Sequence, residues 1–203
     1  MKAIPIKNHQ IIQRLDLIAQ DMYKLPHKFK RKPYPKTDIA TLKTLMADEN
    51  FQGFPKGSNN IDYSGRSVSV DFRDRTAALI GAIKELTACP HWYWDSMIFQ
   101  PPVTGWTAWH NGGDKPHKFI SFINNGGEGF TNYIKGDKHT KIEDRHRPAD
   151  TKDWTCLVGE LDGSTTWKSD INRGDTPRLV LTLAIKGRYN NAFEEFETFV
   201  KNV

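Results

Sequence analysis

The chain has 203 residues, a formal net charge of +5 and a hydrophobic share of 37%, which suits one β-rich domain with a sizeable core. No apolar run approaches the ~20 residues that span a bilayer, and residues 1–10 lack the apolar region of a secretory signal, so we expect neither a membrane span nor signal-directed export. Cys89 and Cys156 lack metal-ligand spacing, and we expect both to be reduced and buried.

Three helices are predicted in the first ninety residues, over about 9–23, 39–46 and 74–88, because apolar residues recur there at helical spacing. The residues expected to face the core are Ile11, Ile12, Leu15, Ile18, Ala19, Met22, Ile39, Leu42, Leu45, Ala78, Leu79, Ala82, Ile83 and Leu86. Residues 68–72 alternate between apolar and polar, which predicts a short strand before the third helix.

Residues 24–36 form a basic segment with five lysines, one arginine and three prolines. The prolines exclude a regular helix, so we expect an extended arm or loop. Phe29 and Tyr34 offer rings for stacking, which makes a nucleic-acid contact one interpretation. The alternative is a solvated connector, and we favour it because a short arm without a binding module is weak evidence for nucleic-acid binding.

From residue 91 onward the pattern changes to short apolar runs separated by turns, typical of a jelly roll, sandwich or barrel. Strands are predicted over 92–99, 105–110, 118–124, 130–134, 154–161, 165–170 and 177–186. We interpret the polar residues 136–153 as a long surface loop and a candidate contact surface. A closing helix is predicted over about 191–202, where Phe193, Phe196, Phe199 and Val200 form a stripe.

The predicted class is therefore α+β: a double-stranded β-helix (jelly roll) with N-terminal helices packed on one face and a C-terminal helix. We expect a single domain over 1–203, with a helical part (1–90), a β-helix core (91–187) and a final helix (188–203).

Several motifs in the second half of the chain occur in an order that points to a known family. They are Pro-Pro, Gly and Trp-His within PPVTGWTAWHNGG, then GGEGFTNYI, Trp154-Thr155-Cys156, Thr166-Trp167-Lys168 and Pro177-Arg178-Leu179-Val180-Leu181. Over roughly 92–187 this order resembles small phage-encoded members of the 2-oxoglutarate/Fe(II)-dependent oxygenase superfamily. The resemblance implies an iron site with two histidines and a carboxylate, and an arginine that pairs with the cosubstrate carboxylate.

Position by position, the resemblance implies that His110 is the first iron ligand and that Arg178 binds 2-oxoglutarate. The carboxylate expected two residues after the histidine is replaced by Gly112, and Asp114 could substitute only if the intervening turn folded back. The second histidine position is occupied by Lys168, and an ammonium has no lone pair with which to coordinate iron.

We therefore expect a degenerate iron site, in which Lys168 supplies a permanent positive charge paired with Asp114, Asp170 or Glu160. The alternative is a working enzyme with Fe(II) and 2-oxoglutarate as cofactors, in which His110 and Asp114 bind the metal. For His110 itself, an ordinary hydrogen-bonded histidine at the rim or in the core is an equal alternative.

Three functions follow from these expectations. The first is a non-catalytic oxygenase-like protein, a structural or protein-interaction module whose partners include phage structural proteins and whose location is the host cytoplasm or a virion. The second is an Fe(II)/2-oxoglutarate-dependent hydroxylase that acts on a protein or nucleic-acid substrate. The third is a nucleic-acid-binding accessory protein that uses residues 24–36.

Overall fold

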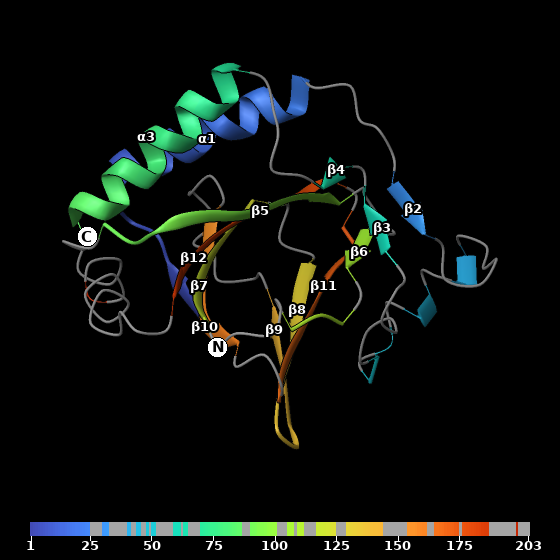
Figure 1. Ribbon diagram of the computed structural model, residues 1–203. Helices are drawn as coiled ribbons and strands as arrows, with labels where there is room; N and C mark the ends of the chain where they lie inside the picture. Colours follow the sequence, from blue (N-terminus) through green and yellow to red (C-terminus); the bar gives the residue numbers. More distant parts are fainter. Residues whose placement is uncertain are drawn as a thin grey trace.

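A computed structural model describes most of the β core and the two longer helices (Figure 1). The described residues are 1–24, 30–32, 40–41, 44–45, 48, 50–51, 59–61, 63–64, 70–86, 90–100, 105–107, 109–111, 117–124, 129–143, 154–161, 165–174, 176–186 and 198. Within them, no helix is long and apolar enough to cross a membrane.

Two six-stranded antiparallel sheets form the core. The first sheet has the order β1 (Lys2–Pro5), β10 (Trp154–Leu161), β7 (His117–Asn124), β12 (Arg178–Lys186), β5 (Tyr93–Gln100) and β4 (Tyr63–Ser64). The second has the order β2 (Lys30–Lys32), β3 (Asn59–Ile61), β6 (Gly105–Thr107), β11 (Thr166–Asn172), β8 (Gly129–Lys135) and β9 (Lys138–Glu143).

Successive strands from β5 onward alternate between the two sheets, except for the β8–β9 hairpin. Such alternation wraps the chain into a double-stranded β-helix, in which one face of each sheet lines a shared interior. The predicted α+β double-stranded β-helix is thus confirmed.

Two helices, α1 (His9–Lys24) and α3 (Val70–Leu86), lie together over the outer face of the first sheet (Figure 1). Their buried side chains, including Ile11, Leu15 and Leu79, pack against apolar residues of that sheet in one large cluster. The prediction of helices packed on one face is confirmed. The interior of the β-helix is left to a different, largely polar set of side chains.

Helix α1 begins where the sequence predicts, because Asn8 caps it. The Asn8 Oδ1 atom accepts hydrogen bonds from the backbone N–H groups of Gln10 at 3.0 Å and Ile11 at 3.1 Å. Farther along, Asp16 accepts a hydrogen bond at 2.8 Å from the indole N–H of Trp154 on β10. The helix is therefore attached to the sheet by a partly buried hydrogen bond as well as by its apolar face.

The predicted strands of the second half are confirmed within a few residues, but the prediction of a loop over 136–153 is wrong for its first part. Residues 138–143 form β9, which pairs with β8 from Lys135↔Lys138 to Phe130↔Glu143. The turn between them contains Gly136 with a φ of 57°, a conformation that glycine adopts without strain. Residues 144–153 lie outside the described part.

Other corrections concern the helices. The predicted strand over 68–72 is wrong at residues 70–72, which belong to α3: five alternating residues are too few to distinguish a strand from a helix start. Leu45 is 37% exposed and Ala78 is exposed, so neither faces the core. Cys156 is free and buried, as predicted. Cys89 and all of the closing helix except Thr198, which is helical, lie outside the described residues.

Candidate functional site

The structure brings His110 and Lys168, the two positions that the resemblance assigns to histidine ligands, opposite each other. An isolated antiparallel bridge joins them, with the backbone N–H of each residue donating to the carbonyl of the other at 2.9 Å. Directly opposite residues of an antiparallel pair project to the same side of a sheet. His110 is partly buried and Lys168 is 6% exposed, so both positions lie at or near the interior.

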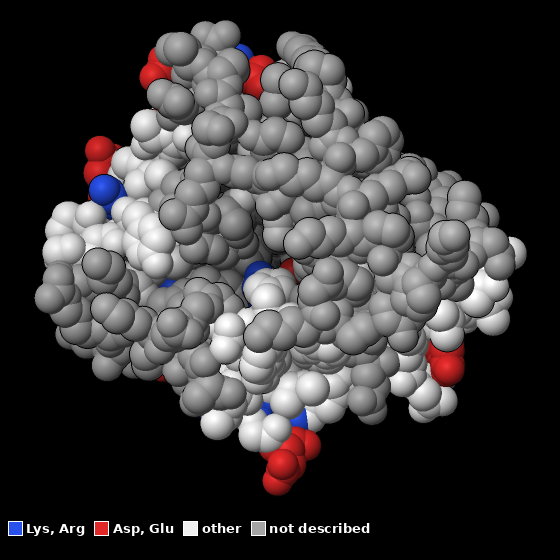
Figure 2. Space-filling model, turned by 45° about the vertical axis from the view of Figure 1, so that its right-hand side comes forward, with Lys and Arg blue, Asp and Glu red and all other residues white. Residues whose placement is uncertain are grey.

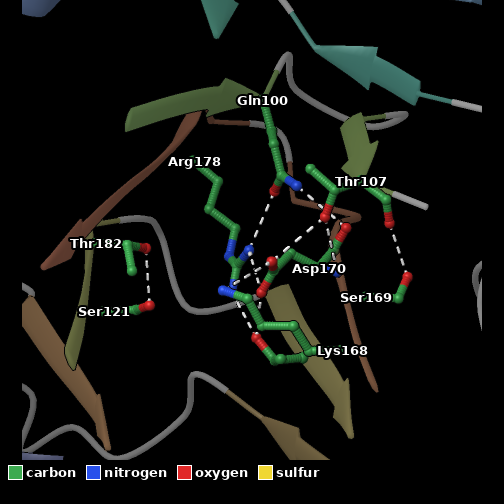
Figure 3. Close-up of polar contacts among 9 residues, drawn as sticks. Gln100, Thr107, Ser121, Lys168, Ser169, Asp170, Arg178 and Thr182 are labelled. Atoms are coloured by element: carbon green, nitrogen blue, oxygen red, sulfur yellow. Dashed lines mark hydrogen bonds and ion pairs between the residues drawn. The ribbon is translucent and has the colours of Figure 1, made fainter. Parts of the chain in front are cut away.

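Asp170 follows Lys168 by two residues on β11 and therefore shares its face. Its carboxylate is buried and accepts hydrogen bonds from two threonines, Thr131 Oγ1 at 2.7 Å and Thr107 Oγ1 at 3.3 Å. The Asp170 backbone N–H in turn donates to Thr107 Oγ1 at 3.0 Å, which directs the hydroxyl proton toward the carboxylate (Figure 3).

Arg178 reaches the same carboxylate from the other sheet. It opens β12, is completely buried, and places Nη1 3.7 Å from Asp170 Oδ1. Two neighbours fix the guanidinium: Nη1 donates to Gln100 Oε1 at 3.1 Å and Nη2 donates to Thr131 Oγ1 at 3.2 Å. Gln100 also donates to the backbone carbonyl of Asp170 at 3.1 Å. The polar contacts thus join the two sheets through Asp170 (Figure 3).

Lys168 completes an interior ion cluster, by which we mean Lys168, Asp170 and Arg178. The ammonium lies 3.7 Å from Asp170 Oδ2, which is an ion pair but longer than a hydrogen bond. Burial alone would raise the pKa of Asp170. The charges of Lys168, Arg178 and His110 and the hydrogen bond from Thr131 outweigh it and hold the pKa well below its usual range. The Asp170 carboxylate is therefore ionised at neutral pH.

The ammonium of Lys168 also faces an aromatic wall. It lies 4.9 Å from the centre of the Phe119 ring on β7, and Tyr133 is its cross-strand neighbour on β8. Phe119 has no room to move toward β10, since a Cβ atom at Gly159 would lie 2.9 Å from its ring. Lys168 thus sits between an apolar wall and the Asp170 carboxylate.

One face of the molecule is hollowed, and Figure 2 shows both basic and acidic atoms at the base of this hollow. Within the interior ion cluster, the side chain of Lys168 is 7% exposed, whereas those of Asp170 and Arg178 are 1% and 0% exposed. Lys168 is therefore the member of the cluster that solvent reaches most easily.

The described residues do not fit a mononuclear iron site. Such a site requires three ligand groups, and the residue opposite His110 is Lys168, where the resemblance implies a second histidine. The nearest buried carboxylate, Asp170, is occupied by two threonine hydroxyls and two cations. No group of three histidine, cysteine, aspartate or glutamate side chains in the described ranges is placed to hold a metal ion. Asp114, the other proposed ligand, lies outside those ranges.

Of the two described carboxylates among those considered as partners for Lys168, Asp170 forms an ion pair with it. Glu160 is exposed on β10, and only its backbone carbonyl enters a described contact, accepting from Tyr133 at 3.1 Å. The sequence analysis missed Gln100, Thr107 and Thr131, which hold Asp170 and Arg178 in place. No local pattern identifies these three, because their roles depend on how the strands pair.

Comparison with protein-family models and with curated proteins gives no match. Among solved structures, EvdMO1 is similar with a TM-score of 0.51 and 12% identity, over 91% of this chain and 46% of that one. This chain thus spans about half the length of EvdMO1. EvdO2 from Micromonospora carbonacea var. aurantiaca matches at a TM-score of 0.36 and 10% identity, over 91% of this chain and 92% of that one.

A Pseudomonas putida prolyl-4-hydroxylase matches at a TM-score of 0.35 and 14% identity, over 85% of this chain and 98% of that one. At these identities the comparisons concern the fold alone, and the likeness to EvdMO1 agrees with the β-helix described above. The comparison with EvdMO1 therefore supports the double-stranded β-helix as the fold of this chain.

Proposed function

We propose that this protein is a non-catalytic member of the oxygenase-like β-helix proteins, in which the fold serves as a structural or protein-interaction module. The observation that carries the proposal is that Lys168 lies directly opposite His110 in the β-bridge. An ammonium there has no lone pair to donate to iron, and that of Lys168 is ion-paired with Asp170 at 3.7 Å.

The contacts around Arg178 support the same conclusion. In a working enzyme, the planar guanidinium would offer its paired N–H groups to the carboxylate of 2-oxoglutarate. Here the same groups donate to Gln100 and Thr131, and Asp170 supplies a negative charge 3.7 Å away. The arginine is thus held by the protein itself, and the cluster acts as an internal connection between the two sheets.

Anaerobic titration with Fe(II) and 2-oxoglutarate tests the proposal. We expect the wild type to show no visible charge-transfer band. A band that saturates at one iron per chain would overturn the proposal and favour the alternative, an active hydroxylase.

Restoring the expected ligands gives a matched comparison. The double variant Lys168→His with Gly112→Asp supplies the histidine and the carboxylate that the family pattern requires. We expect this variant to gain the band, whereas Lys138→His, on the exposed β8–β9 hairpin, should not. A folded double variant that binds no iron would show that positions 112 and 168 do not correspond to metal-ligand positions.

The partners of such a module are proposed from sequence alone. The resemblance to small phage-encoded proteins supports a role among phage structural proteins, in the host cytoplasm or in a virion. Mass spectrometry of purified particles tests this: the chain should be present at a fixed ratio to known structural proteins. Its absence from particles, together with its presence in the lysate, would contradict a virion location.

A further inference from the structure

The interior ion cluster contains more positive than negative charge. Lys168 and Arg178 are both cations, and Asp170 is the carboxylate between them. Arg178 has hydrogen-bond acceptors in Gln100 and Thr131, so Asp170 and these two residues satisfy it. Lys168 shares the same carboxylate at 3.7 Å and has no such acceptors among the described residues. Within the described part of the chain, one positive charge therefore stays uncompensated next to the interior wall, and burying an unpaired charge is energetically costly.

The N–H donors of the Lys168 ammonium also lack an acceptor in the described ranges. Its side chain is only 7% exposed, and its ammonium has no hydrogen-bond acceptor among the residues that the structure describes. Buried polar groups of native proteins nearly always have partners, and a buried ammonium carries three donors. The contact with the Phe119 ring at 4.9 Å offsets part of the charge but accepts no hydrogen bond in the usual sense.

We propose that Lys168 is the anchor of a metal-free binding site for a small organic monocarboxylate inside the β-helix. A single negative charge matches the single uncompensated positive charge of the cluster. A carboxylate oxygen accepts the charge-assisted hydrogen bonds that the ammonium offers. Phe119 beside the ammonium, with Tyr133 opposite Lys168 on β8, favours an organic anion with an apolar tail over an inorganic one.

The other side of the ammonium limits how the ligand lies. Both oxygens of Asp170 already accept hydrogen bonds from threonines, and a second carboxylate is repelled from that side. The bound carboxylate therefore approaches Lys168 from the side away from Asp170, along the Phe119 wall. This arrangement requires neither His110 as a metal ligand nor any free donor on Arg178, so the site is independent of iron.

Propionate is a suitable probe, used in a chloride-free buffer with EDTA and followed by ligand-observed NMR. We expect saturable binding to the wild type, with magnetisation transfer between the propionate methyl group and ring protons of Phe119. Inorganic phosphate and chloride should compete weakly. Replacing the ammonium by an apolar chain of similar length, in Lys168→Met, should weaken binding roughly 10- to 100-fold, the loss expected for a charge-assisted hydrogen bond.

The matched control is Lys138→Met, because Lys138 is exposed on β9. This variant should bind propionate with the same affinity as the wild type. Equal loss in both variants, or chloride displacing propionate at equal concentration, would mean general charge attraction and would overturn the site. Absence of binding to the wild type would also overturn it. The transfer to Phe119 is measured on the wild type, so the test does not depend on the folding of a variant.

Discussion

Asp170 is the residue on which the stability of the β-helix interior should depend most. Its carboxylate is ion-paired with two buried cations and accepts two hydrogen bonds. The variant Asp170→Asn keeps the shape but removes the charge and leaves both cations buried without a counter-ion. Breaking a buried ion pair in this way costs about 3–5 kcal/mol of folding free energy. We expect a loss of that size in urea unfolding followed by tryptophan fluorescence.

Lys168→Met should behave in the opposite way. It removes the surplus cation, leaves the pair of Asp170 and Arg178 intact, and places an apolar chain beside Phe119. Because replacing a buried charge by a well-packed apolar group is often neutral or stabilising, the free energy of unfolding should fall by less than ~1 kcal/mol or rise. A control substitution at an exposed turn, Asp137→Asn, should change it by no more than ~0.5 kcal/mol.

The reasoning would be refuted if Lys168→Met cost as much as Asp170→Asn, because Lys168 would then be as necessary to the charge balance as the carboxylate. A loss below ~1 kcal/mol in Asp170→Asn would equally contradict it. The double variant gives a further check. Removing one cation together with the carboxylate should recover part of the stability lost in Asp170→Asn, a coupling that a double-mutant cycle measures.

Three other outcomes follow. The pKa of Asp170 is lowered in the folded state, so its contribution to folding free energy is fully present above the pKa of an unfolded aspartate, ~3.9, and declines below it. The difference in unfolding free energy between wild type and Asp170→Asn should therefore shrink as pH falls from 5 to 3, and a constant difference would contradict this. Gly159→Ala should lower the free energy of unfolding by about 1–3 kcal/mol and shift the NMR signals of the Phe119 ring, since the added Cβ would lie 2.9 Å from that ring. An unchanged NMR spectrum would argue against the contact. Asn8→Ala should cost about 1 kcal/mol by removing the cap of α1, and no change in urea unfolding would argue against capping.

Hydrophobic periodicity predicts most of this fold because the first sheet is covered by helices on its outer face. Strands such as β10 and β12 therefore carry apolar residues on both faces and stand out in the sequence. The strand β9 was missed because its residues 138–141 are all polar and lie at a sheet edge, so it lacks a buried apolar row. The Gly136-Asp137 pair before it is a hairpin-turn signal that the polar composition of the segment obscured.

Some features of the candidate site can likewise be predicted from the sequence, and others cannot. Lys168 and Asp170 are two residues apart on one strand, so the period of two predicts that they share a face. Contacts between strands cannot be predicted from spacing along one strand. Those of Gln100 with Arg178 and of Thr131 with Asp170 follow from strand register. Register depends on how all the strands of a sheet pack together, and no short stretch of sequence contains that information.

Iron binding and carboxylate binding make different demands on Lys168, and this separates the two proposals experimentally. Iron requires a lone pair at position 168, which the ammonium lacks, whereas a carboxylate requires a positive charge and N–H donors, which it has. Lys168→His should therefore favour metal binding and weaken carboxylate binding, while Lys168→Met should weaken carboxylate binding without restoring any metal ligand. If the wild type bound both iron and propionate, His110 and residues outside Lys168 would have to supply the metal ligands, and only the carboxylate site would stand.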